Sequence, residues 1–289
     1  MINAAKAVRL GPRDDAAADP LLGAGGRFVV GFDGSAASEA ALGWAAVRAA
    51  RNSAALVIAG VVDDDAGAMG SAFSEESART LALLLSETTD RIEQAHPGVP
   101  VSSELLTGSV AWALAGAATP HDLVVIGSDK TGYARGRVYG ARSIQIAAVT
   151  PGPLAVVPSV DLRLRSGVVV AVDDTEKAPA LARMGAREAL IRRAELILVH
   201  AVPLGSGEAR LACADKVLAA ARSAALEECD QLEVRSYLAH RHPADSILNL
   251  ARDKALLLIG RSRRPESFGV GGTTHEVLTN ANAPVIVVP

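Results

Sequence analysis

Short apolar runs recur in the same order along the chain, and glycine, proline or charged residues bound them. They are rich in Val, Leu and Ile without alternating polar residues, which is typical of strands buried on both faces of a parallel sheet. The matching runs are RFVVGFDGS (27–35) with GVVVAVDDT (167–175), ALVIAGVV (55–62) with ELILVHAV (195–202), HDLVVIGS (121–128) with KALLLIGR (254–261), and PLAVVP (153–158) with PVIVVP (284–289). The repetition indicates two copies of one folding unit.

Helical patterns separate these runs, and each copy has a further expected strand, near 100–106 and near 233–239. The first helix of copy one, at 35–51, has Ser35 or Ser38 in position to cap its N-terminus. Alternating strands and helices predict a parallel sheet with right-handed crossovers and helices on both faces. The other expected helices are 74–95, 109–118 and 143–149 in copy one, and 175–193, 207–229 and 243–252 in copy two.

The chain of 289 residues is long enough for two domains with cores of ordinary size. Aromatic residues make up only 3% of it, so Val, Leu, Ile and Ala must fill those cores. We divide the chain into a flexible leader at 1–25, domain 1 at 26–158, a linker at 159–166 and domain 2 at 167–289.

Composition narrows the classes of partner and compartment. The net charge of −3 provides no long-range attraction to nucleic acid or to an anionic membrane. No apolar run approaches the ~18 residues needed to span a bilayer. Cys213 and Cys229 form no CxxC or Cys/His cluster, so we expect free buried thiols in a reducing cytoplasm and no metal site. Trp44 and Trp112 fall on apolar helix faces and are expected in the core.

Candidate functional residues lie where the expected strands end. Asp33 follows the first strand and Gly127 ends the fourth, while Asp173 and Gly260 hold the matching places in copy two. Open parallel sheets bind ligands beyond the carboxyl ends of the strands, where the strand order reverses. If the first and fourth strands are neighbours, each pair of residues faces one crevice. A helix N-terminus after such a strand also offers main-chain N–H groups to an anion.

VVGFDGSAASEAAL at 29–42, VIGS at 125–128, a glycine 13 positions after Gly127, and PLAVVP at 153–158 together resemble a universal stress protein domain. The whole chain resembles a tandem of two. The resemblance implies an α/β fold of two Rossmann-like (adenine-nucleotide alpha-hydrolase-like) domains, each a five-stranded parallel sheet of order 3-2-1-4-5 with helices on both faces. It also implies that the domains pair through their last strands, 154–158 with 285–288, and it leaves further homodimer formation open.

Some members of this family bind ATP through a loop of pattern G-x2-G-x9-G-[S/T]. The resemblance therefore implies an adenine-nucleotide site in one or both domains, with the need for Mg²⁺ left open. The first-strand aspartate would flank the adenosine, and the loop glycines and the following Ser/Thr would receive the phosphates. The matching positions in domain 1 are Asp33, Val61, Ile126, Gly127, Lys130, Gly140, Ala141, Arg142 and Ser143, and those in domain 2 are Asp173, Ala201, Ile259, Gly260, Arg263, Gly272, Thr273 and Thr274.

Both loops depart from the family pattern. Lys130 and Arg263 replace the second glycine, Ala141 replaces the hydroxyl residue, and the domain 2 loop is one residue shorter. Neither basic residue allows the close backbone approach of glycine, although a cation there could meet a phosphate oxygen directly. Ala141 removes one donor and leaves the main-chain N–H groups in place.

Three functional hypotheses follow. The first is a stress-response regulator that binds adenine nucleotide, and the second is a nucleotide-independent interaction scaffold with degenerate loops. The third, a slow ATP-hydrolysing enzyme, has the weakest support because no residue is identified as catalytic. The aspartates at 33 and 173 are either ligand contacts or turn and cap residues. Arg135, Arg137 and Arg142 form either a phosphate rim or a solvated basic loop.

Overall fold

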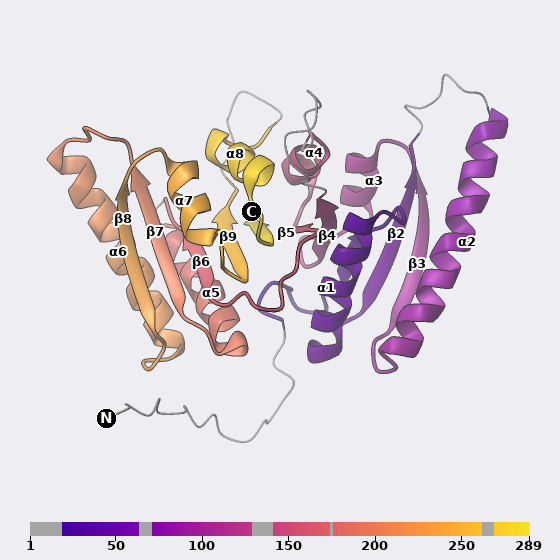
Figure 1. Cartoon of the computed structure of the whole chain (residues 1–289), viewed down its shortest axis with the longest axis horizontal. Coiled ribbons are helices and arrows are strands. Elements are labelled where there is room, and N and C mark those ends of the chain that lie inside the picture. The colour runs from indigo at the N-terminus through magenta and orange to yellow at the C-terminus, as the bar shows by residue number, and fades with distance from the viewer. Residues whose placement is uncertain (1–18, 64–70, 129–140, 174–175, 262–268) are drawn as a thin grey trace.

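The computed structural model of the chain describes residues 19–63, 71–128, 141–173, 176–261 and 269–289. Strands and helices alternate through both halves, as the apolar runs predict (Figure 1). Within these described ranges, no helix combines the length and the apolar character needed to cross a bilayer.

The elements of each half follow the expected order, and their ends differ from the expected positions by a few residues. In domain 1 they are β1 (Phe28–Gly31), α1 (Ala36–Asn52), β2 (Leu56–Val62), α2 (Ser71–Ala95), β3 (Val101–Thr107), α3 (Val110–Gly116), β4 (Leu123–Ser128), α4 (Ala141–Val149) and β5 (Leu154–Pro158). In domain 2 they are β6 (Val168–Ala171), α5 (Ala178–Arg192), β7 (Leu196–Val202), α6 (Glu208–Glu228), β8 (Val234–His240), α7 (Pro243–Ala251), β9 (Leu256–Gly260), α8 (Gly272–Asn280) and β10 (Val285–Val288).

In the part of the chain that the structure describes, the strands form one ten-stranded sheet in the order β3-β2-β1-β4-β5-β10-β9-β6-β7-β8. Each half has the order 3-2-1-4-5, which confirms the fold that the resemblance implies. Neighbouring strands within a half are parallel, with β1 between β2 and β4. At the centre β10 runs antiparallel to β5, with Ile286 opposite Ala155.

Helices cover both faces of this sheet (Figure 1). One apolar core packs α1, α2, α5 and α6 against it, with side chains such as Leu42 and Leu181 fully or almost fully buried. The other packs α3, α4, α7 and α8, with side chains such as Leu114 and Val277. The central strands are buried on both faces, which explains why their sequences lack alternation.

Asp19 and Leu21, near the end of the leader, are each only 3% exposed and pack against domain 1. Two expectations about burial are wrong. Trp112 was expected in the core and is 61% exposed, because the short helix α3 turns its neighbours Ala111 and Leu114 inward instead. The thiol of Cys213 is free but exposed, since it lies beside the buried stripe of α6 rather than on it.

Candidate functional site

A pocket of about 160 Å³ lies in domain 1 at the carboxyl ends of β1, β2 and β4, beside the first turns of α1 and α4. We call it the domain 1 pocket. It brings together six of the residues predicted from the sequence: Asp33, Val61, Ile126, Gly127, Arg142 and Ser143. The rest of its lining is Gly31, Phe32, Ser35, Ala37, Ser38, Ala59, Val110, Leu114 and Ile146. The expected crevice between neighbouring first and fourth strands is therefore present.

Asp33 lies in a tight turn between β1 and α1. Gly34 has a positive φ of 78°, a conformation that glycine adopts without the steric cost of a side chain. The amide of Ser35 donates to Asp33 Oδ1 at 3.0 Å, and Ser35 Oγ accepts from the amide of Ser38 at 3.2 Å as the N-cap of α1. Asp33 is thus a turn residue whose carboxylate also faces the pocket.

Local hydrogen bonds keep the carboxyl group of Asp33 ionised. Burial by itself would raise the pKa of Asp33, but hydrogen bonds from Ser35 and Ser38 and the charge of Arg142 hold that pKa below its ordinary value. A charged carboxylate at the mouth of a partly apolar pocket is a strong hydrogen-bond acceptor. It suits a ligand that presents hydroxyl or amino hydrogens.

The N-terminus of α4 forms the basic side of the pocket. Arg142 is exposed, and its Nη2 lies 3.7 Å from Oδ2 of Asp63 at the end of β2. Ser143 is 7% exposed and lines the pocket one residue further along the helix. The positive end of the helix dipole and a guanidinium therefore act on the same region, which favours an anion there.

The floor of the domain 1 pocket is apolar. Ile126, Leu114 and Ile146 are at most 7% exposed, and Val61 is half-buried. Gly31 keeps this floor compact, since a Cβ there would lie 3.0 Å from Leu114 Cδ1 and 3.2 Å from Ile126 Cγ2. A flat apolar group fits above such a floor better than a charged one.

Gly127 has a packing role that the sequence did not reveal. A Cβ at this position would lie 2.2 Å from the carbonyl carbon and oxygen of Ala37 and 2.6 Å from the amide nitrogen of Ser38. The glycine therefore lets the end of β4 touch the first turn of α1. Gly260, its counterpart in domain 2, has no described atom within 4 Å of such a Cβ.

Domain 2 places its candidates at the carboxyl ends of its own strands. Asp173 follows β6 and is exposed, Gly260 ends the neighbouring strand β9, and Ile259 is 3% exposed. Ala201 on β7 is half-buried, and α8 begins at Gly272. Of the residues that follow, Thr273 is half-buried, and Thr274, the third residue of α8 as Ser143 is of α4, is 3% exposed.

The two domains differ in how the first helix begins. The side chain of Ser35 caps α1, whereas α5 starts after Lys177, which makes no side-chain cap bond. Residue 175, which matches Ser35 in the repeat, lies outside the described residues.

Several predicted residues cannot be placed. Lys130, Gly140 and Arg263 lie outside the described residues, as do Arg135 and Arg137, and only the backbone of Ala141 is described. The sequence reasoning in turn missed Asp63 as a pocket-side residue. The acidic run after β2 was the available signal, because it ends a strand that borders the crevice.

A second, more polar pocket of about 530 Å³ lies between α7 and α8 of domain 2. Its lining includes Arg241, Arg252, Asn249 and Glu276, and none of the predicted site residues. Its charged groups are of both signs, so it selects for neither an anion nor a cation. In the described ranges, no group of three or more His, Cys, Asp or Glu residues is arranged to hold a metal ion.

Comparisons with known proteins agree with the fold. The family model described as the universal stress protein family matches residues 26–158 and 166–289. A universal stress protein of Mycobacterium tuberculosis is 27% identical over 90% of this chain and 94% of its own length, and one of Mycolicibacterium smegmatis is 28% identical over 90% and 96%. A crystal structure of a universal stress protein from Archaeoglobus fulgidus superposes with a TM-score of 0.70 at 18% identity, covering 91% of this chain and 96% of that one.

Proposed function

Because the chain belongs to the universal stress protein family, we propose that it is a stress-response regulatory protein that binds an adenine nucleotide, ATP, in the domain 1 pocket. The observation that carries this proposal is the juxtaposition of an ionised carboxylate, an apolar floor and a basic helix N-terminus in one crevice. Each of these features suits one part of a nucleotide.

The chemistry of the pocket lining suggests which residues contact the base, the ribose and the phosphates. The adenine base lies against the apolar side chains of Val61 and Ile126, and the ribose hydroxyls donate to the carboxylate of Asp33. The phosphates lie toward Arg142 and the first N–H groups of α4. Arg142 then exchanges its 3.7 Å contact with Asp63 for phosphate oxygens.

The size of the pocket limits what it encloses. Pockets that bury most of a drug-sized ligand have volumes of about 300–1,000 Å³, whereas this one has about 160 Å³. It therefore encloses a nucleoside-sized part of the ligand. The phosphates extend beyond it, so that AMP and ATP share the enclosed contacts.

We assign the first site to domain 1 because its aspartate is fixed by the Ser35 cap and its basic residue is in place. Domain 2 keeps Thr273 and Thr274 at the start of α8, which supports a second, weaker site. The antiparallel pairing of β5 with β10 supports an internal pseudo-dimer in which both sites belong to one particle.

A nucleotide-independent scaffold is the second candidate, and Gly127 is the observation that favours it. Its contact with Ala37 explains the glycine by packing alone, without a ligand. Under this hypothesis the family loop survives because the fold requires it.

Calorimetric titration of the full chain with ATP and AMP separates the two candidates. We expect heat of binding with wild type and a loss of about tenfold or more in affinity for Asp33→Asn, because a hydrogen bond to a charged group contributes about 1.5–3 kcal/mol. Asp173→Asn is the matched control and should keep the stronger site. Absence of binding by wild type would establish the scaffold, and unchanged affinity in Asp33→Asn would contradict the domain 1 assignment.

A further inference from the structure

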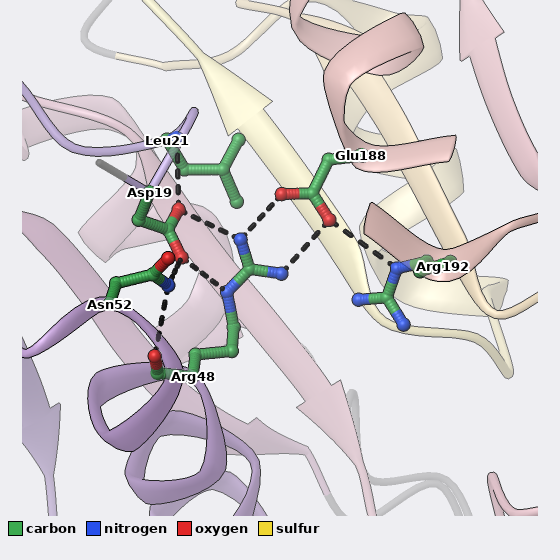
Figure 2. A network of polar contacts seen from close by, with 6 residues as sticks. All are labelled: Asp19, Leu21, Arg48, Asn52, Glu188 and Arg192. Carbon is green, nitrogen blue, oxygen red and sulfur yellow. Dashed lines mark hydrogen bonds and ion pairs between the residues drawn. The ribbon is translucent and has the colours of Figure 1, made fainter. Parts of the chain in front are cut away.

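A network of charged side chains is buried between the two domains (Figure 2). Arg48 on α1 donates from Nε and Nη2 to the carboxylate of Asp19, at 3.0 and 2.8 Å. It also donates from Nη1 and Nη2 to Glu188 on α5, at 3.0 and 2.5 Å. Glu188 accepts from Arg192 Nε at 3.3 Å, and Asn52 donates to Asp19 at 2.9 Å. We call Asp19, Arg48, Glu188 and Arg192 the axis network.

The two residues at its centre occupy the same position in the two copies. Arg48 and Glu188 are 140 residues apart, the same spacing that separates the first strands of the repeat. The closing strands show the same relation, since Ala155 lies opposite Ile286 and each is the third residue of its PLAVVP or PVIVVP run. Equivalent residues therefore meet across one pseudo-twofold axis. In a true twofold interface, identical residues would meet there.

Pairing between like domains would bring like groups together on that axis. Asp19 and Arg192 would still balance the net charge of each half. However, Arg48 would meet a second Arg48, or Glu188 a second Glu188, and the atoms facing the axis would lose their partners. A buried polar group without a partner costs about 1–3 kcal/mol, and more when it is charged.

When domain 1 pairs with domain 2, the opposite charges of the axis network stabilise one another. Burial by itself would lower the pKa of Arg48, but Glu188 and Asp19 raise it. Burial by itself would raise the pKa of Glu188, but Arg48 and Arg192 lower it. The guanidinium of Arg48 also lies 4.8 Å from the ring centre of Trp44, which fixes its plane. Arg48 and Glu188 therefore stabilise each other in their charged forms.

On the opposite face of the sheet, domain 2 makes a second contact with domain 1 for which domain 1 has no equivalent residue. Arg261 follows β9 and is 7% exposed, and its Nη1 donates to the carbonyl oxygens of Ala147 and Thr150 at the end of α4, at 3.1 and 2.6 Å. The matching residue of domain 1 is Ser128, the last residue of its HDLVVIGS run. A serine is too short to make the same reach, so pairing of domain 1 with itself would lose this contact as well.

We propose that the axis network makes domain 1 select domain 2 as its partner and disfavours pairing of domain 1 with a second copy of domain 1. A buried ion pair contributes little net stability, because desolvation offsets much of the attraction between its charges. The opposite charges of Arg48 and Glu188 instead determine that the surface of domain 1 pairs with the surface of domain 2.

Complementary charge variants test the selection in the full chain. In Arg48→Glu and in Glu188→Arg, like charges meet on the axis both within a chain and between two copies of the variant, so each variant alone should have a lower unfolding midpoint than wild type. When the two are mixed, Arg48 of one chain can meet Glu188 of the other, and a one-to-one heterodimer with exchanged domains should form. The neutral variant Glu188→Gln is the size-matched control for the charge. The proposal is overturned if both charge variants keep the unfolding midpoint of wild type, or if light scattering detects no heterodimer in their mixture.

A neutral triple variant keeps the proposal testable if the charge variants do not fold. Asp19→Asn, Arg48→Met and Glu188→Met together should leave the unfolding midpoint close to that of wild type. Two batches labelled in domain 1 with different dyes should then exchange partners after joint refolding, so that domain 1 pairs with domain 1 and energy transfer between the two dyes rises. Loss of about 1.4 kcal/mol of discrimination corresponds to a roughly tenfold rise in exchanged species. Exchange no greater than in wild type, or a triple variant that is unfolded, would show that the network does not set the partner.

Discussion

Replacing Gly127 by alanine should destabilise domain 1 severely, because the added methyl group would overlap the backbone of α1. Its Cβ would lie 2.2 Å from the carbonyl group of Ala37 and 2.6 Å from the amide nitrogen of Ser38. These atoms belong to the first turn of α1, so relief requires the strand and the helix to move apart. Overpacking costs about 1–3 kcal/mol, and a backbone obstruction places the loss of unfolding free energy near the upper end, about 3 kcal/mol.

Gly260→Ala is the matched control in domain 2. It stands at the same place in the repeat, no described atom lies within 4 Å of the added Cβ, and its φ is not positive. An alanine at a compatible position restricts the unfolded chain and stabilises a protein by about 0.4–1 kcal/mol. The two substitutions should therefore change stability in opposite directions.

Urea unfolding measures both effects. The two tryptophans of the chain, Trp44 and Trp112, lie in domain 1, so their fluorescence follows that domain while circular dichroism follows the whole chain. With a slope of about 1–3 kcal/mol per molar urea, Gly127→Ala should lower the fluorescence midpoint by roughly 1–3 M. A midpoint equal to that of wild type or of Gly260→Ala would refute the packing argument.

Further predictions follow from single side chains. Asp122→Ala should lower unfolding free energy by about 2–4 kcal/mol in denaturant titration, because the amides of Arg27 and Thr119, which donate to its carboxylate at 2.7 and 2.9 Å, lose their acceptor. Burial by itself would raise the pKa of Asp122, but these donors hold it below 3.8. Its stabilising effect should therefore be complete above that pH and disappear as the pH falls through the lowered value, an acid limb that Asp122→Ala should lack. Trp112→Ser should leave the free energy of unfolding, measured by circular dichroism in urea, within about 0.5 kcal/mol of wild type, because the side chain is 61% exposed. Adenosine lacks the phosphates that titrate between pH 5 and 8, so its affinity should be constant over that range and weaken only as Asp33 protonates, since the pKa of Asp33 is lowered. A transition of adenosine affinity near neutral pH in calorimetry would contradict the role of that carboxylate.

The fold was predictable from the sequence because buried parallel strands leave unbroken apolar runs, and because those runs repeat. The place of the site was predictable for a related reason: Asp33 and Gly127 end strands that the sheet order makes neighbours. The exposure of Trp112 was not predictable, since a helix of seven residues gives too few positions to fix which side faces the core. The packing role of Gly127 was also hidden, because it depends on how closely α1 approaches β4.

Domain pairing shows where local patterns stop being informative. Arg48 and Glu188 each occur on an otherwise apolar helix face, and each alone resembles an unfavourable burial of charge. Their shared position in the repeat was readable from the sequence, but its meaning depends on the axis that brings those two positions together. A chain that contains both copies can place different residues at one symmetric position, which a twofold pair of identical chains cannot do. The fusion of two domains therefore lets complementary charges replace identical residues on the axis, and the partner becomes part of the same sequence.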